Sequence, residues 1–192
     1  YMLYGSPAIG GDSGIDNYAL VAVNPDGTEK WRVTSYYMLY GSPAIGEDGS
    51  VYVAGRHRRV FAVNADGTRK WTSPDLGDII WTGVTLDEDG NVYVGVQSGK
   101  VVSLDPMGVI RWSTDIEGAQ NIQAQPALSP DSRTLYIAST GDGERLFALD
   151  TSTGEVKWRA NVGPNILSSP IVGADGTIYI GSRGNYLYAL DH

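Results

Sequence analysis

The chain has 192 residues, and 42% of them are hydrophobic, which is enough apolar material for one domain with a full core. Its formal net charge of -8 at pH 7 makes the general surface unsuited to binding nucleic-acid phosphates. The sequence has no cysteine and no long apolar run, so it offers no disulfide, no thiolate metal ligand and no transmembrane helix.

One short pattern recurs along the chain: an apolar strand, a Gly-bearing turn and a tryptophan. The copies end at Trp31, Trp71, Trp112 and Trp158, and a truncated fifth copy, ALDH, stands at the C-terminus. A regular period of roughly 40 residues is typical of repeat architectures. We therefore divide a single domain, residues 1–192, into repeats at about 1–36, 37–77, 78–119, 120–163 and 164–192.

Each repeat is predicted to contain four short strands. The first lies in a small-residue and proline segment that starts at Ser6, Ser42, Gly83, Gln125 and Ser169. The second follows a tight turn, in SVYVAG from Ser50, NVYVGV from Asn91, TLYIAS from Thr134 and TIYIGS from Thr177. The third is ALVAVN from Ala19, RVFAVN from Arg59, KVVSLD from Lys100, RLFALD from Arg145 and YLYALD from Tyr186, and the tryptophan strand comes last. Alternating Val, Ile, Tyr and Leu between Gly-containing turns favours strands, and no segment has a helical period.

The combined pattern resembles a known repeat. SP-x-[IV]-x-x-DG-x-[IV]-Y-[IV]-G, followed by [LV]-[FY]-A-[LV]-[DN] and G-x-x-x-W, is similar to the pyrroloquinoline-quinone-type (PQQ-like) β-propeller repeat of quinoprotein dehydrogenases and of the β-barrel-assembly lipoprotein. The resemblance covers essentially the whole chain and implies an all-β propeller of four-stranded antiparallel blades. It also implies that the four tryptophans dock against the Gly turn and the neighbouring blade. The small position opening the motif is then Ala22, Ala62, Ala148 and Ala189, with Ser103 in the third copy.

The first and last blades are predicted to be incomplete. The interval from Ile9 to Leu20 is shorter than that from Ile45 to Val60, so the second strand of the first blade should be stunted. The last copy stops at His192, before any tryptophan strand. We expect about five blade-like units that either close as a small ring or form a section of a larger one. An unpaired sheet edge at the seam would favour self-association there.

A column of aromatic residues precedes the innermost strands and is the candidate ligand-binding site. Tyr4, Tyr40 and Trp81 occupy it in three neighbouring repeats, and Gln123 occupies it in the fourth. One interpretation is that these rings fill space between blades. The other is that they form a recognition surface for a peptide strand or a carbohydrate, with Gln123, Gln125, Asn121 and Asn165 on its polar side.

Four consecutive basic or ionisable residues, Arg56 to Arg59, form a second candidate, in the link between the second and third strands of the second repeat. A solvated turn and a contact for an anion or an acidic partner are both compatible with this run. Salt-sensitive binding would favour the contact.

The resemblance to quinoprotein dehydrogenases makes redox catalysis a function to consider. In the dehydrogenases the quinone lies under a disulfide of adjacent cysteines, and carboxylate and amide groups hold a calcium ion. This chain has no cysteine, and Asp26, Asp48, Asp66, Asp89 and Asp175 are expected in hairpin turns. His57 and His192 lack plausible triad partners. We therefore expect no catalytic residue, no metal site and no cofactor.

The sequence thus favours a non-enzymatic propeller scaffold that binds a protein, a peptide or a carbohydrate outside the cytoplasm. One alternative is a fragment of a quinone-dependent dehydrogenase. Another is a duplicated or engineered propeller without a ligand, because residues 1–10 and 37–46 share the identical decamer YMLYGSPAIG.

Overall fold

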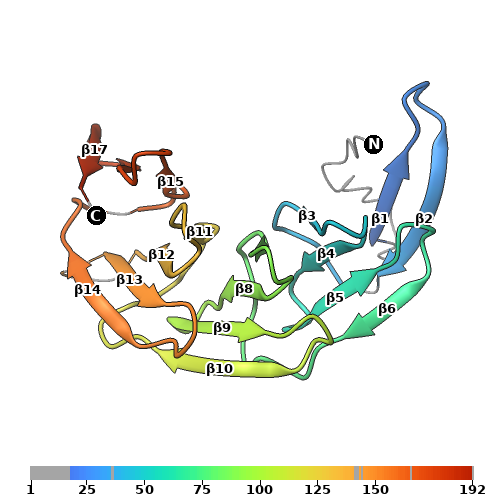
Figure 1. Cartoon of the computed structure of the whole chain (residues 1–192), viewed down its shortest axis with the longest axis horizontal. Helices are drawn as coiled ribbons and strands as arrows, with labels where there is room; N and C mark the ends of the chain where they lie inside the picture. Colours follow the sequence, from blue (N-terminus) through green and yellow to red (C-terminus); the bar gives the residue numbers. More distant parts are fainter. Residues whose placement is uncertain (1–17, 36, 141–142, 144, 165, 192) are drawn as a thin grey trace.

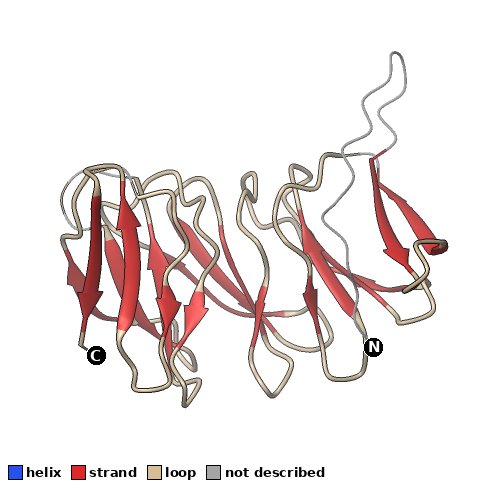
Figure 2. Ribbon diagram, turned by 90° about the horizontal axis from the view of Figure 1, so that it is seen from above, coloured by secondary structure: helices blue, strands red, loops and turns tan. Residues whose placement is uncertain are grey.

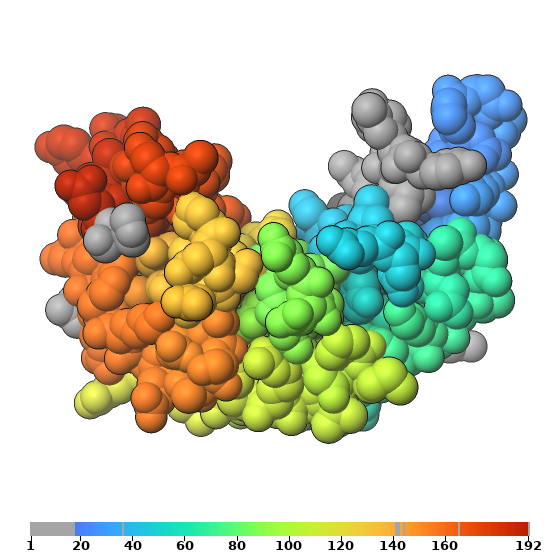
Figure 3. Space-filling model, viewed as in Figure 1, coloured from blue at the N-terminus to red at the C-terminus, as the bar shows by residue number. Residues whose placement is uncertain are grey.

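The protein is described by a computed structural model that places residues 18–35, 37–140, 143, 145–164 and 166–191. Within these ranges every regular element is a β-strand, and the sheets stand side by side (Figure 2). From β1 (Tyr18–Val23) to β17 (Tyr186–Leu190) they follow an open arc (Figure 1). The space-filling view shows the same opening between the two ends (Figure 3). The predicted all-β propeller architecture is therefore confirmed, as an open section among the described residues.

Three blades are complete four-stranded antiparallel sheets. Blade 2 contains β3 (Ala44–Ile45), β4 (Val51–Ala54), β5 (Val60–Val63) and β6 (Arg69–Thr72). Blade 3 contains β7 (Thr85–Leu86), β8 (Val92–Gly95), β9 (Lys100–Leu104) and β10 (Ile110–Asp115). Blade 4 contains β11 (Ala127–Leu128), β12 (Thr134–Ala138), β13 (Leu146–Asp150) and β14 (Val156–Ala160).

The first and last blades have fewer than four strands among the described residues. Blade 1 consists of β1 and β2 (Glu29–Ser35) among the described residues. Blade 5 consists of β15 (Ile171–Val172), β16 (Ile178–Ser182) and β17. The innermost and second strands expected for the first repeat lie outside the described residues. No helix in the described ranges has the length and apolar character needed to cross a bilayer.

Asp-Gly pairs shape the hairpin turns. Asp66 accepts a hydrogen bond of 2.9 Å from the backbone N–H of Thr68, and Gly67 has a φ of 90°. Equivalent side-chain bonds to the backbone occur at Asp26, Asp48 and Asp175. A positive φ is costly for a residue with a Cβ atom, so glycine is favoured there. The turn assignment of these four aspartates is confirmed.

Each tryptophan strand pairs its indole-bearing residue with a small residue of the third strand. The pairs are Ala22 with Trp31, Ala62 with Trp71, Ser103 with Trp112 and Ala148 with Trp158. A register shift lies next to each of these pairs. A bulge increases the local twist of a strand, so the repeated bulge turns every outer strand in the same way.

Three of these indoles contact the hairpin turn of the following blade. Their Nε1 atoms donate hydrogen bonds to backbone carbonyls: Trp31 to Ala65 at 3.0 Å, Trp71 to Pro106 at 2.8 Å and Trp112 to Thr151 at 2.9 Å. A Cβ atom added at the turn glycine would lie within 2.7 Å of the ring, at Gly67, Gly108 and Gly154. The absence of a side chain at these glycines therefore lets the flat rings join consecutive blades.

An apolar cluster fills each boundary between blades. At the boundary of blades 3 and 4, Tyr93 and Val101 pack with Leu135, Ile137 and Phe147, and all are at most 1% exposed. Because the middle strands are covered on both sides, they are buried along their length, as in β4 and β8. Complete burial of one such side chain contributes about 1.5 to 3 kcal/mol to folding. The blade boundaries therefore form the core that holds the arc in shape.

Candidate functional site

The rings of Tyr40 and Trp81 meet across the boundary of blades 2 and 3. Their centroids are 4.3 Å apart and their planes are tilted by 55°. Tyr40 lies four residues before β3 and Trp81 lies four residues before β7, so the equivalent segments of two blades bring them together. Both side chains are half-buried. The pair therefore packs between blades and also presents aromatic surface to solvent.

The polar atoms of the two rings differ in their partners. Trp81 donates from Nε1 to Oε1 of Gln97 at 3.0 Å, whereas the Tyr40 hydroxyl donates to the sulfur of Met38 at 3.1 Å. Thioether sulfur is a weak acceptor. The indole N–H is therefore occupied within the protein, and the Tyr40 hydroxyl can exchange its weak bond for one to a ligand.

Arg56 adds a positive charge to this aromatic pair. Its guanidinium carbon lies 5.8 Å from the centroid of the Trp81 ring, and its Nη1 lies 3.9 Å from the Met38 sulfur. The side chain is exposed and has no carboxylate partner among the described residues. A cation beside an indole face is favourable and leaves the outer N–H groups able to donate to an anion. We call Tyr40, Arg56 and Trp81 the aromatic face.

The other members of the basic run have different environments. Arg58 forms an ion pair with Asp75 at 2.6 Å, and Arg59 donates to the carbonyl of Ser73 at 2.7 Å. Burial, assisted by the charges of Arg69 and Arg59, lowers the pKa of His57 to about 4. His57 is therefore neutral at pH 7. The run does not act as a group of four cations, and Arg56 is its member on the aromatic face.

The two predicted glutamines lie in different settings. Gln123 is exposed and donates from Nε2 to Oδ1 of Asn121 at 3.0 Å. Gln125 is half-buried, donates from Nε2 to the carbonyl of Val84 at 2.9 Å, and donates from its backbone N–H to Oγ of Ser169 at 3.0 Å. Gln125 thus links blades 3, 4 and 5. Tyr4 and Asn165, which were also predicted for this site, lie outside the described residues.

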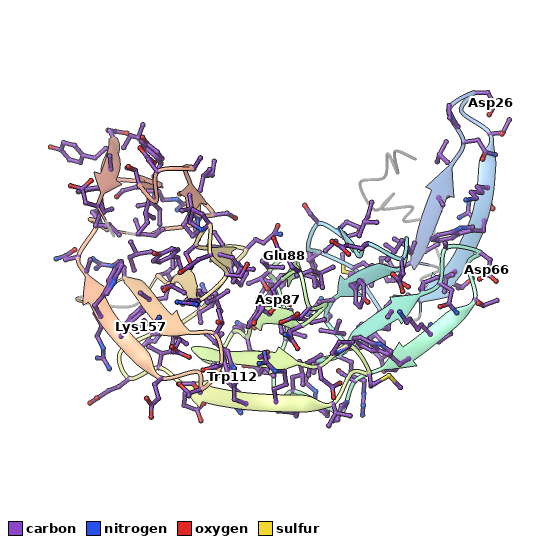
Figure 4. The ribbon with its side chains drawn as sticks, in the orientation of Figure 1. Asp26, Asp66, Asp87, Glu88, Trp112 and Lys157 are labelled. Atoms are coloured by element: carbon purple, nitrogen blue, oxygen red, sulfur yellow. The ribbon has the colours of Figure 1, made fainter. Side chains whose placement is uncertain are left out.

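An acidic groove that the sequence analysis did not anticipate lies where turns of blades 2 and 3 approach each other. It has a volume of about 550 Å³, and its lining includes Asp48, Lys70, Asp87 and Glu88. Figure 4 shows Asp87 and Glu88 on the turn between β7 and β8. Lys70 lies 2.6 Å from Asp48, and this hydrogen bond is the main reason that the pKa of Asp48 falls to about 2. With Glu47 and Asp89, the groove has five carboxylates. Asp48 and Asp89 were predicted only as turn residues, and the other three were not singled out from the sequence.

The residues present do not fit a quinone and calcium pair of the kind that the resemblance implies. The whole sequence lacks the cysteines of the quinone-covering disulfide. In the described ranges, His, Asp and Glu side chains form no group of three that could hold a metal ion. The donor set required for that cofactor is therefore missing from this part of the chain, and no step involving the cofactor follows from it.

Comparisons with known proteins agree with the fold. A family model described as outer membrane protein assembly factor BamB matches residues 13–130 and 112–192. The crystal structure of BamB from Moraxella catarrhalis is similar, with a TM-score of 0.73 and 25% sequence identity. That match covers 92% of this chain and 53% of the other, so the chain spans about half the length of the solved structure. No individual curated protein matches the chain.

Proposed function

Because the chain belongs to the PQQ-like β-propeller family described as outer membrane protein assembly factor BamB, we propose that it is a non-enzymatic scaffold for protein partners. The family name refers to the assembly of outer membrane proteins, and this supports a role outside the cytoplasm. A rigid arc of blades suits such a role, because its apolar boundaries hold the surface loops in fixed positions.

The aromatic face is the proposed contact for a partner segment. The observation that carries the proposal is the 4.3 Å packing of Tyr40 on Trp81 across two blades, with Arg56 beside the indole. Aromatic and Arg side chains contribute strongly to protein interfaces, because they combine a large contact area with polar groups. The ligand that fits is an extended peptide with an apolar side chain for the rings and a carboxylate for Arg56. Gln123 is exposed and occupies the equivalent position of the next blade, so we expect it to extend the polar rim of this face.

A displayed library of random peptides, followed by calorimetry with the selected synthetic peptides, tests this function. Trp81→Ala should weaken binding of those peptides by at least about 30-fold, because a central aromatic anchor is removed. Tyr186→Ala is the matched control, because Tyr186 is 65% exposed and belongs to blade 5. Urea unfolding of each variant separates loss of binding from loss of fold.

Three outcomes would contradict the proposal. They are failure of the library to yield any binder, equal affinities of the Trp81→Ala and Tyr186→Ala variants for the selected peptide, and unfolding of the Trp81→Ala protein. The last result would assign the ring pair to packing between blades. A parallel glycan array checks the carbohydrate alternative, and binding there without any peptide binding would replace the peptide as the ligand.

A further inference from the structure

The turn between β9 and β10 of blade 3 presents apolar side chains to solvent. Met107 is 73% exposed, Val109 is 58% exposed and Ile110 is 38% exposed. Blades 1 and 2 have Asp-Gly-Thr at the place in the repeat where blade 3 has Met-Gly-Val, and blade 4 has Thr-Gly-Glu. Single exposed apolar residues are ordinary, whereas neighbouring ones form a patch that marks an interaction site. We call Met107, Val109 and Ile110 the apolar turn.

The conformation of this turn does not require apolar side chains. Oδ1 of Asp105 accepts hydrogen bonds of 2.9 Å from the backbone N–H groups of Met107 and Val109. Gly108 supplies the positive φ of 81°. The backbone demands of the turn are thus met by Asp105 and Gly108, and polar side chains at the two positions between and beyond them would serve the fold equally well.

The apolar turn is not exposed for lack of a neighbouring blade. Blade 3 lies in the middle of the arc, with blades 2 and 4 on either side of it (Figure 1). All three are complete four-stranded sheets. Trp71 of blade 2 already occupies its docking place against Gly108 and Pro106. The side chains of Met107 and Val109 therefore remain exposed although both adjoining blades are in place.

The acidic groove lies directly beside the apolar turn. Pro106, the residue before Met107, belongs to the lining of the groove. A Cβ atom added at Gly90, another lining residue, would lie 3.6 Å from Cγ of Pro106. The groove also contains apolar surface of its own, because Ile45 is 48% exposed and Leu86 is half-buried. The two features therefore form one surface with an apolar strip along an acidic one.

Negative charge in the groove is only partly compensated. Among the described residues that line it, Lys70 is the only basic one, and its ammonium group is paired with Asp48 at 2.6 Å. Glu88 and Asp89 are exposed, and neither forms an ion pair within the described ranges. Their carboxylates can thus accept hydrogen bonds from a cationic ligand.

We propose that the apolar turn and the acidic groove together bind a basic, amphipathic segment of a partner protein. Its apolar side chains pack on Met107, Val109 and Ile45, and its lysine or arginine side chains pair with the groove carboxylates. An anionic lipid surface does not suit this site, because the carboxylates would repel it.

This surface is separate from the aromatic face. Tyr40 precedes β3, whereas Glu47 and Asp48 of the groove follow it, so the two surfaces lie at opposite ends of the innermost strand. Their charges are also opposite, since Arg56 suits a carboxylate and the groove suits a cation. The inference therefore goes beyond the proposed peptide site and can fail or hold independently of it.

Three short synthetic peptides of equal length are the probes. One alternates leucine with lysine, the second alternates serine with lysine, and the third alternates leucine with glutamate. Titration calorimetry with the whole chain should show the leucine–lysine peptide binding at least about tenfold more tightly than either of the others, because it alone offers both apolar and cationic groups. Trp81→Ala should leave this binding unchanged, which separates the test from that of the aromatic face.

A turn-swap variant tests the apolar contribution. Asp105→Asn, Met107→Asp and Val109→Thr together convert DPMGV at 105–109 into NPDGT, the sequence of blade 1 at 24–28, without changing the net charge. Binding of the leucine–lysine peptide should weaken by about tenfold, because burial of two apolar side chains is lost. Binding of the serine–lysine peptide should not change. Urea unfolding should show a fold as stable as that of the wild type.

A pair of charge variants tests the acidic contribution. Glu88→Gln with Asp89→Asn should weaken binding of the leucine–lysine peptide by about three- to tenfold and reduce its dependence on salt. Asp115→Asn with Glu117→Gln is the matched control, because it removes the same charge from blade 3 at the opposite end of β10. The control should bind as the wild type does.

Several results would overturn the proposal. They are no binding of the leucine–lysine peptide, equal binding of the leucine–glutamate peptide, and unchanged binding in the turn-swap variant. An equal loss in the two charge variants would reduce the attraction to net charge alone. Binding of anionic phospholipid vesicles that the turn-swap variant loses would make a membrane surface the occupant in place of a protein segment.

Discussion

The indole N–H of Trp71 donates a 2.8 Å hydrogen bond to the carbonyl of Pro106, which lies in the hairpin turn of the next blade. The same ring lies against Gly108, where an added Cβ atom would approach the ring to 2.6 Å. The contact depends both on a donor in one blade and on a missing side chain in the next.

The first prediction follows from this contact. Gly108→Ala should destabilise the protein by about 1 kcal/mol because alanine disfavours a positive φ. Displacement of the indole should add about 1 to 3 kcal/mol to this loss. Gly118→Ala is the matched control, because Gly118 has the same φ of 81° and nothing within 4 Å of an added Cβ. Urea unfolding of the two variants should separate the steric cost from the backbone cost. Equal losses would show that the indole contact contributes nothing.

The second prediction concerns the two glutamines of the candidate site. Gln125→Ala should lower the free energy of unfolding by about 1 kcal/mol, because the hydrogen bond to Val84 between blades is lost. Gln123→Ala should change it by less than about 0.5 kcal/mol, because its amide is exposed and pairs with Asn121 alone. A larger loss from Gln123→Ala than from Gln125→Ala would reverse these assignments.

The third prediction concerns charge on the aromatic face. Arg56→Gln should weaken binding of a selected carboxylate-bearing peptide by about two- to fivefold, and should reduce the dependence of that binding on salt. Arg58→Gln is the control, because Arg58 belongs to the same loop but is paired with Asp75. Isothermal titration at low and high salt measures both effects. The assignment fails if both variants lose the same affinity.

The fourth prediction is a pH dependence caused by His57. Burial lowers its pKa from 6.5 to about 4 in the folded state, so the unfolded chain binds more protons in that interval. Stability should therefore fall as the pH decreases from 6.5 to 4. His57→Phe keeps a ring between Tyr37 and Phe61 and should flatten this part of the profile. A profile that is identical in wild type and variant would refute the assignment.

A separate acid window belongs to the turn carboxylates. Hydrogen bonds from Lys70 and from Ser152 are the largest causes that lower the pKa values of Asp48 and Asp150 to about 2. These groups contribute stability above their usual pKa of 3.8, and the contribution disappears as the pH falls toward 2. The His57→Phe variant should therefore lose stability only in the lower pH range, where Asp48 and Asp150 become protonated.

Local patterns were sufficient to predict the strands and their turns, and the resemblance to the PQQ-like repeat implied their assembly into blades. Short runs of β-branched and aromatic residues such as Val51–Ala54 specify a strand, and the Asp66-Gly67 pair specifies the turn between β5 and β6, because both depend on neighbours in the sequence. The alignment of repeats also placed Tyr40 and Trp81 in equivalent positions of adjacent blades. Their contact follows from the regular stacking of those blades.

Other features depend on loop conformation and could not be predicted in this way. Arg56 reaches Trp81 from a loop in which Arg58 adopts a φ of 60°. This backbone conformation is unusual for a residue other than glycine, so the sequence did not indicate it. Gln125 resembled Gln123 in the sequence, but the close approach of Gly83 turns it into a link between blades. The acidic groove likewise combines turns from two blades, and the sequence of either turn alone does not indicate it.

Amide hydrogen exchange with and without a selected peptide tests the central claim most directly. Exchange should become slower in the segments around Tyr40 and Trp81 and in the loop that contains Arg56, and it should not change in blade 5. Protection confined to the acidic groove or to blade 5, with the aromatic face unchanged, would contradict it.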